Sequence, residues 1–226
     1  MNYLATILVV VIGILIYYLY SFVTNNELTS GLQSLDKLTT VDSNKLKNPN
    51  SYTYSYQCWL YISSPPSQEK QLYSRKSADG KDNSVFEVTL VGQDLILKAG
   101  SGSSAPVKVM TITSDFPIQK WTHLVINVYN LKTFEAYING KLAKTVQSQN
   151  VPKPVSNRTN LNIGGSGPIG YVTKFTRTET ALDAKTVWDA YLSGNGLNNL
   201  FSSIIPYGLN LSISKGEELQ RSITIF

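Results

Sequence analysis

Apolar and polar residues alternate along most of the chain after residue 51, the pattern of strands that bury one face and expose the other. In the longest run, residues 52–63, Tyr56 and Cys58 fall on one side while Trp59 and Tyr61 fall on the other. Shorter runs with the same period cover residues 85–91, 94–99, 107–113, 122–130 and 171–177. Loops rich in Gly, Ser, Asp and Pro separate them. The pattern predicts an all-β fold of antiparallel strands.

Two further patterns predict a hairpin and one short helix. Residues 134–146 form two alternating runs on either side of Asn139 and Gly140, which readily adopt the positive φ of a type I′ turn. Residues 182–193 change to a helical period, with Asp183 as the N-cap and Gly194 as the C-terminal stop. Residues 209–214 and 221–226 are expected to be two closing strands of the same domain.

The N-terminal part of the chain has the character of a membrane anchor. Residues 4–23 are an uncharged apolar run of about 20 residues, the length that a helix needs to cross a bilayer. Near its end lie Tyr17, Tyr18 and Tyr20, as expected for aromatic side chains at the membrane interface. We therefore predict a single transmembrane helix in residues 1–25. Residues 26–50, polar with leucines at helical spacings, are expected to be a stalk or linker, and residues 51–226 the β-sandwich domain.

Composition and charge indicate which partners and which cell compartment to expect. With 42% hydrophobic and 15% charged residues the chain can form a core, and its formal charge of +5 comes from scattered Lys and Arg residues, so nucleic-acid binding is not expected. Cys58 is the only cysteine, which excludes an intramolecular disulfide and favours a reducing compartment. The lysines that follow the apolar segment, the first being Lys37, also favour a cytosolic position for the C-terminal domain.

Several short motifs resemble a known superfamily. They run from Trp121 to Val125, Tyr137 to Lys141, Leu161 to Gly164, Gly170 to Phe175 and Leu182 to Tyr191. Together they resemble the concanavalin A-like lectin/glucanase superfamily in its laminin-G-like jelly-roll form. The resemblance implies two curved antiparallel sheets packed face to face, with the short helix over one edge. The C-terminal tail behind an N-terminal anchor is similar to membrane-associated minor capsid proteins of large icosahedral DNA viruses.

The residues offer no recognisable catalytic machinery. Glucanases need two carboxylates facing the same side of the sugar, whereas Glu87, Asp94 and Glu135 are each the only carboxylate in their expected strand. His123 is the sole histidine, and its place after Trp121 points to a structural role. We therefore expect a non-enzymatic protein without a cofactor.

Two weak ligand sites remain as alternatives. Asp79, Asp82 and Asn83 supply the oxygen atoms that a calcium loop requires, although a tight Asp-Gly turn explains the same residues. Trp59 and Tyr61 can stack on sugar rings, although core packing or a subunit contact explains them equally well.

Two functions follow from these expectations. The leading hypothesis is a membrane-anchored minor capsid protein that tethers a viral capsid shell to the virion internal membrane, with its domain on the cytosolic side during assembly. Its partners would be membrane lipid, through the N-terminal helix, and capsid or coat proteins. The alternative is a membrane-anchored surface lectin or adhesion module that binds glycan. An enzyme descended from glucanases ranks last.

Overall fold

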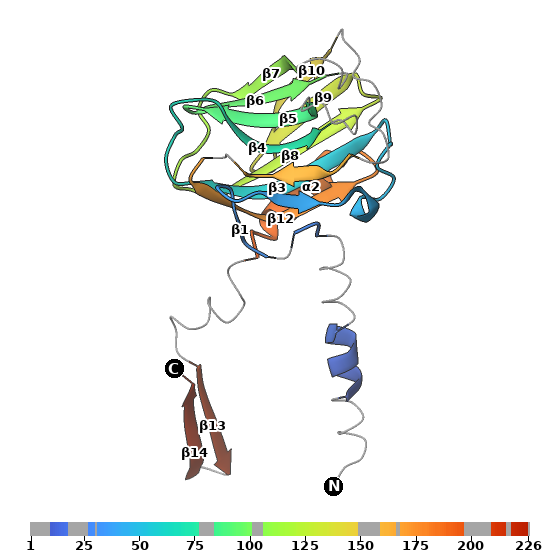
Figure 1. Cartoon of the computed structure of the whole chain (residues 1–226). Helices are drawn as coiled ribbons and strands as arrows, with labels where there is room; N and C mark the ends of the chain where they lie inside the picture. The colour runs from blue at the N-terminus through green and yellow to red at the C-terminus, as the bar shows by residue number, and fades with distance from the viewer. Residues whose placement is uncertain are drawn as a thin grey trace.

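Two six-stranded antiparallel sheets enclose one hydrophobic core (Figure 1). The computed structural model describes residues 10–17, 27–29, 31–76, 84–100, 106–148, 159–165, 168–196, 209–215 and 218–225. Sheet A has the order β1 (Gln33–Ser34), β12 (Gly170–Thr178), β3 (Tyr54–Ile62), β8 (Thr122–Tyr129), β9 (Thr133–Ile138) and β10 (Lys141–Gln147). Sheet B has the order β2 (Thr39–Val41), β11 (Leu161–Ile163), β4 (Lys70–Lys76), β5 (Ser84–Val91), β6 (Asp94–Ala99) and β7 (Val107–Thr113). The predicted all-β, two-sheet sandwich is confirmed.

Strand β3 runs through the middle of sheet A and shows how alternation builds the core. Tyr56, Cys58 and Leu60 are fully buried between the sheets, together with residues of β5 and β6 from the other sheet. Burial raises the pKa of the Cys58 thiol, so this cysteine is an inert core residue. Trp59 and Tyr61 point to the outer face of sheet A, as the alternation predicts.

The β9–β10 hairpin forms at the predicted turn. Asn139 and Gly140 have φ of 49° and 77°, the left-handed values that a type I′ turn requires. The Asn139 side chain also accepts a hydrogen bond from the backbone N–H of His123, at 3.0 Å. The turn is thereby fixed against the start of β8.

The segment expected to be a stalk is part of the sandwich, which corrects that prediction. Between residues 31 and 50 the chain forms β1 on the edge of sheet A, β2 on the edge of sheet B, and the 3-10 turn η1 (Ser43–Lys45). Leu35, Val41 and Leu46 are buried in the core. The leucines of this segment, although spaced as in a helix, do not form one helical face. The segment crosses from sheet A to sheet B, and Leu35 is buried in the core while Leu38 is exposed.

The described residues of the N-terminal region include a short helix over residues 10–17. Within the described ranges no helix is long and apolar enough to cross a membrane. Most of the predicted transmembrane helix, including Tyr18 and Tyr20, lies outside those ranges. Tyr17 is described, and its side chain is exposed.

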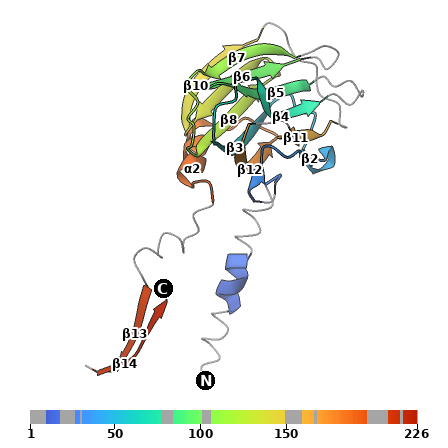
Figure 2. The same cartoon turned by 60° about the vertical axis from the view of Figure 1, so that its left-hand side comes forward.

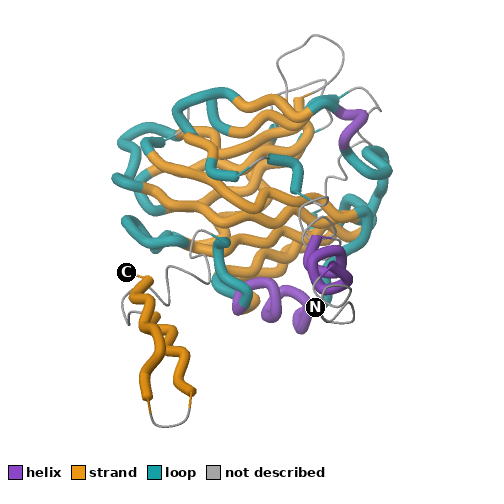
Figure 3. Tube along the Cα trace, turned by 90° about the horizontal axis from the view of Figure 1, so that it is seen from below, coloured by secondary structure: helices purple, strands orange, loops and turns teal. Residues whose placement is uncertain are grey.

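The C-terminal hairpin corrects a second expectation. Strands β13 (Leu209–Lys215) and β14 (Glu218–Ile225) pair with one another, as predicted, but they form a separate two-stranded sheet. They therefore do not close the sandwich. Figure 1 shows this hairpin and helix 10–17 on the side of the sandwich that carries β1 and β12, and Figure 3 shows the hairpin clear of the strands of both sheets.

Candidate binding face

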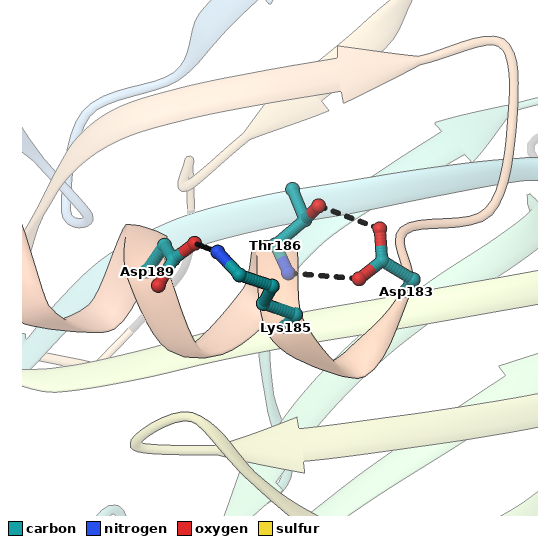
Figure 4. Close-up of polar contacts among 4 residues, drawn as sticks. All are labelled: Asp183, Lys185, Thr186 and Asp189. Atoms are coloured by element: carbon teal, nitrogen blue, oxygen red, sulfur yellow. Dashed lines mark hydrogen bonds and ion pairs between the residues drawn. The ribbon is translucent and has the colours of Figure 1, made fainter.

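Helix α2 (Ala184–Leu192) covers the middle of the outer face of sheet A. The predicted N-cap is confirmed, because the Asp183 carboxylate accepts hydrogen bonds from the N–H of Thr186 at 3.0 Å and from its hydroxyl at 2.6 Å (Figure 4). Gly194, with φ of 71°, follows the last turn and donates its N–H to the Tyr191 carbonyl. The apolar face of the helix places Val187 against Val125 and Tyr137 of the sheet.

A polar network fixes the segment that leads into α2. The buried Asn127 side chain accepts the N–H of Leu182 at 3.1 Å and donates to its carbonyl at 2.8 Å, while the Ser55 hydroxyl donates to the same Asn127 oxygen at 2.6 Å. The Glu135 carboxylate accepts hydrogen bonds from the hydroxyls of Tyr129 and Tyr137. Desolvation, and secondly this carboxylate, raise the pKa of Tyr137 to about 12. Glu135 thus holds the hydroxyls of Tyr129 and Tyr137 in place.

Trp59, one of the two candidates for sugar stacking, lies beneath α2. Its indole is only 6% exposed, with the Tyr191 ring stacked at a centroid distance of 5.8 Å and the His123 ring at 5.1 Å. Neither nitrogen of the buried His123 ring has a hydrogen-bond partner among the residues that the structure describes, and desolvation, with a smaller contribution from Lys174, lowers its pKa to about 4. His123 is therefore a neutral packing residue at neutral pH. The helix blocks the indole face that a sugar would need.

Tyr61, the second candidate for sugar stacking, belongs to a row of three aromatic side chains. Its ring centroid lies 5.5 Å from that of Trp121 and 6.5 Å from that of Tyr171. Tyr171 pairs directly with Tyr61 across β12 and β3, and Trp121 precedes Thr122, the partner of Leu60. Tyr61 and Trp121 are half-buried, and Tyr171 is 42% exposed. This aromatic row, Tyr61, Trp121 and Tyr171, offers a ligand an open platform beside α2.

A cleft opens on the outer face of sheet A, at the opposite end of β3 from the aromatic row. It encloses about 450 Å³ between the segment around η1 and helix α2, with β3 and β12 beneath it. Figure 2 shows α2 and the η1 region on either side of β12. Its lining carries the basic residues Lys45, Lys47 and Arg177, one carboxylate, Glu179, and the hydroxyls of four threonines. We call this site the basic cleft.

The candidate calcium ligands Asp79, Asp82 and Asn83 lie outside the described residues. Within the described ranges, no group of three or more His, Cys, Asp or Glu side chains is placed to hold a metal ion.

The fold and its outer face define a β-sandwich binding domain. Residues 34–196, more than half of the chain, match the model of the concanavalin A-like lectin/glucanases superfamily. The chain belongs to this superfamily. The resemblance predicted from the sequence motifs is thereby confirmed at the level of the family.

Solved structures with the same fold include receptor-binding domains of bacterial toxins. The botulinum neurotoxin serotype G binding domain is 17% identical, with a TM-score of 0.57 over 75% of this chain and 44% of that chain. The serotype D binding domain is 12% identical, with a TM-score of 0.57 over 74% and 44%. The binding domain of botulinum neurotoxin DC in complex with rat synaptotagmin II is 17% identical, with a TM-score of 0.54 over 69% and 39%. At these identities the likeness shows the fold alone, and this chain spans less than half of each of these structures. No curated protein matches the chain.

Proposed function

We propose that the protein is a non-enzymatic membrane tether, with residues 1–25 as a single transmembrane helix and the sandwich as its binding module. The observation that carries the anchor is helix 10–17, in which Val10, Ile14 and Ile16 are each at least half exposed to solvent and the other described side chains are exposed as well. A helix that is apolar all round requires an apolar surrounding, which a bilayer supplies.

The aromatic row supports binding of a protein by the sandwich. Aromatic side chains that remain partly exposed on a rigid sheet give large contact area at little cost in conformational entropy. The partner that we favour is the coat or capsid shell of a virus, with the domain on the cytosolic side of the internal membrane. Confinement to a membrane and repetition of the shell would turn shallow contacts into avidity.

Site-specific photocrosslinking tests this function. A photoreactive amino acid replaces Tyr171 in the full-length chain, in the cells that produce the protein, and the crosslinked product is identified by mass spectrometry. The proposal expects one shell or coat protein as the product. The matched control places the same probe at Leu142, which is 55% exposed on the opposite edge of sheet A, and should give no such product.

A surface lectin is the second candidate, because an open aromatic row also suits stacking on sugar rings. In that case the probe at Tyr171 would crosslink to a glycan or glycoprotein, and Trp121→Ala would abolish binding to a glycan array. The tether proposal expects no glycan binding on the array.

A further inference from the structure

We propose that the basic cleft binds the phosphate group of an anionic lipid in the membrane to which the chain is anchored. The inference deepens the proposed function and rests on its anchor. Three observations support it. They are the chemistry of the residues that line the cleft, the hydrogen bonds that hold the segment with Lys45 and Lys47, and the short length of chain between the cleft and the membrane segment.

The chemistry of the cleft suits a phosphate. Lys45 and Lys47 are exposed and line one side, whereas Glu179 is the single carboxylate among the described residues of the lining. The Gln57 side chain and the Thr176 hydroxyl, paired across β3 and β12, make no hydrogen bond within the described part of the chain and are free to donate to an anion. Lysine cations beside uncharged donors recognise phosphate oxygens.

A buried arginine, Arg177, fixes the segment that carries Lys45 and Lys47. Arg177 is 6% exposed, and its guanidinium donates to the backbone carbonyls of Lys47 and Asn48. It also lies over the Tyr54 ring at 5.0 Å, and no carboxylate forms an ion pair with it in the described ranges. The guanidinium therefore fixes the segment that carries the lysines and adds a positive charge that no described acidic group neutralises.

The cleft lies close to the point where the chain would leave the bilayer. Leu28 lines the cleft, and its N–H donates to the Phe175 carbonyl of β12 at 2.7 Å. The proposed membrane segment ends at residue 25, and three residues span at most about 11 Å. The headgroup layer on each side of a bilayer is roughly 5–8 Å thick. A headgroup at the surface is thus within reach of the cleft, which favours a lipid over a free phosphate.

Native mass spectrometry of the full-length chain released from mixed bilayers tests the proposal. The bilayers contain phosphatidic acid, whose headgroup is the phosphate alone, and phosphatidylcholine, and the ratio of the two lipids retained by the chain is compared with the bulk ratio. We expect phosphatidic acid to be enriched, and Lys45→Gln/Lys47→Gln to reduce its relative affinity about thirtyfold, because each basic residue near an anionic surface contributes about fivefold. Both lysines are exposed, so the variant should fold as the parent does.

Lys141→Gln/Lys144→Gln is the matched control, because it removes the same charge from β10 at the opposite edge of sheet A. It should leave the enrichment unchanged. Retention at the bulk ratio, or an equal loss in both variants, would overturn the proposal. A bound inorganic phosphate on chain taken from phosphatidylcholine bilayers in phosphate buffer would overturn the lipid as its source. Flotation with the bilayers is scored separately: a chain that floats but shows no enrichment refutes the cleft alone, whereas a chain that does not float refutes the anchor.

Discussion

Tyr191 of α2 stacks on Trp59 of β3, with ring centroids 5.8 Å apart and ring planes at 19°. The contact joins a helix near the end of the sandwich sequence to the central strand of sheet A. It explains why an outward-facing tryptophan is only 6% exposed. The proposed binding surface is therefore confined to the parts of the face that α2 leaves open, the aromatic row and the basic cleft.

Tyr191→Ala should weaken the attachment of α2 to sheet A. Loss of the ring removes buried aromatic area and the stacking contact, so we expect the free energy of unfolding to fall by about 2 kcal/mol. Urea denaturation followed by tryptophan fluorescence measures this change, and the native emission should shift to the red as Trp59 becomes exposed. Leu192→Ala, at a residue 64% exposed on the same helix, is the control and should change stability by less than about 0.5 kcal/mol.

Gly140→Ala should destabilise the β9–β10 turn for two reasons. Gly140 has φ of 77°, and a Cβ there would lie 2.6 Å from Cε3 of Trp188. Gly92, with φ of 57° and open space around its Cβ position, separates the two causes. Gly92→Ala should cost about 1 kcal/mol through its backbone conformation alone, and Gly140→Ala about 1–3 kcal/mol more, measured by thermal unfolding. Equal losses in both variants would show that Trp188 does not pack on the turn.

His123 makes stability depend on pH in a defined direction. Its pKa of about 4 in the folded chain is below its ordinary value of 6.5, so the unfolded chain takes up the proton first as the pH falls. Its stabilising contribution is complete above pH 6.5 and declines between pH 6.5 and pH 4, by at most about 3 kcal/mol. His123→Phe keeps a ring between Trp59 and Tyr191 and should flatten this part of the profile in urea unfolding. An unchanged slope would contradict a buried, neutral His123.

Arg177→Met should loosen the segment that joins η1 to β3. The change leaves the carbonyls of Lys47 and Asn48 without their buried donors, for which we expect a loss of about 2–3 kcal/mol. Trypsin should then cut after Lys45 and Lys47, two sites that the intact domain protects more strongly. If trypsin cuts the parent chain there just as fast, residues 31–50 behave as a stalk and not as part of the sandwich.

Most strands could be predicted from the sequence because they bury one face and expose the other. Strand β6 has the predicted bounds, residues 94–99. Strand β4 was missed because a register shift between Gln71 and Tyr73 buries Leu72 and Tyr73 in succession, which destroys the alternation. Strands β1 and β2 are too short to show any period.

The candidate face was harder to predict because it depends on contacts between distant segments. Trp59 and Tyr61 have the same outward phase in β3, yet α2 covers only the first of them. The row that joins Tyr61 to Trp121 and Tyr171 follows from strand register, which the pattern of a single strand does not contain. The basic cleft needs η1 and α2 to be in place, and the sequence pattern predicts a stalk where η1 forms.

Protease protection of the full-length chain in sealed vesicles tests whether the protein is a membrane tether whose sandwich faces the cytosol. The chain is inserted into membranes with the cytosolic side outward, treated with protease, and compared with vesicles opened by detergent. For such a tether, we expect the chain to stay with the membrane after alkaline extraction and the sandwich to be digested in sealed vesicles as it is in opened ones. Full protection of the sandwich in sealed vesicles, or release of the chain by alkali, would contradict a membrane tether that faces the cytosol.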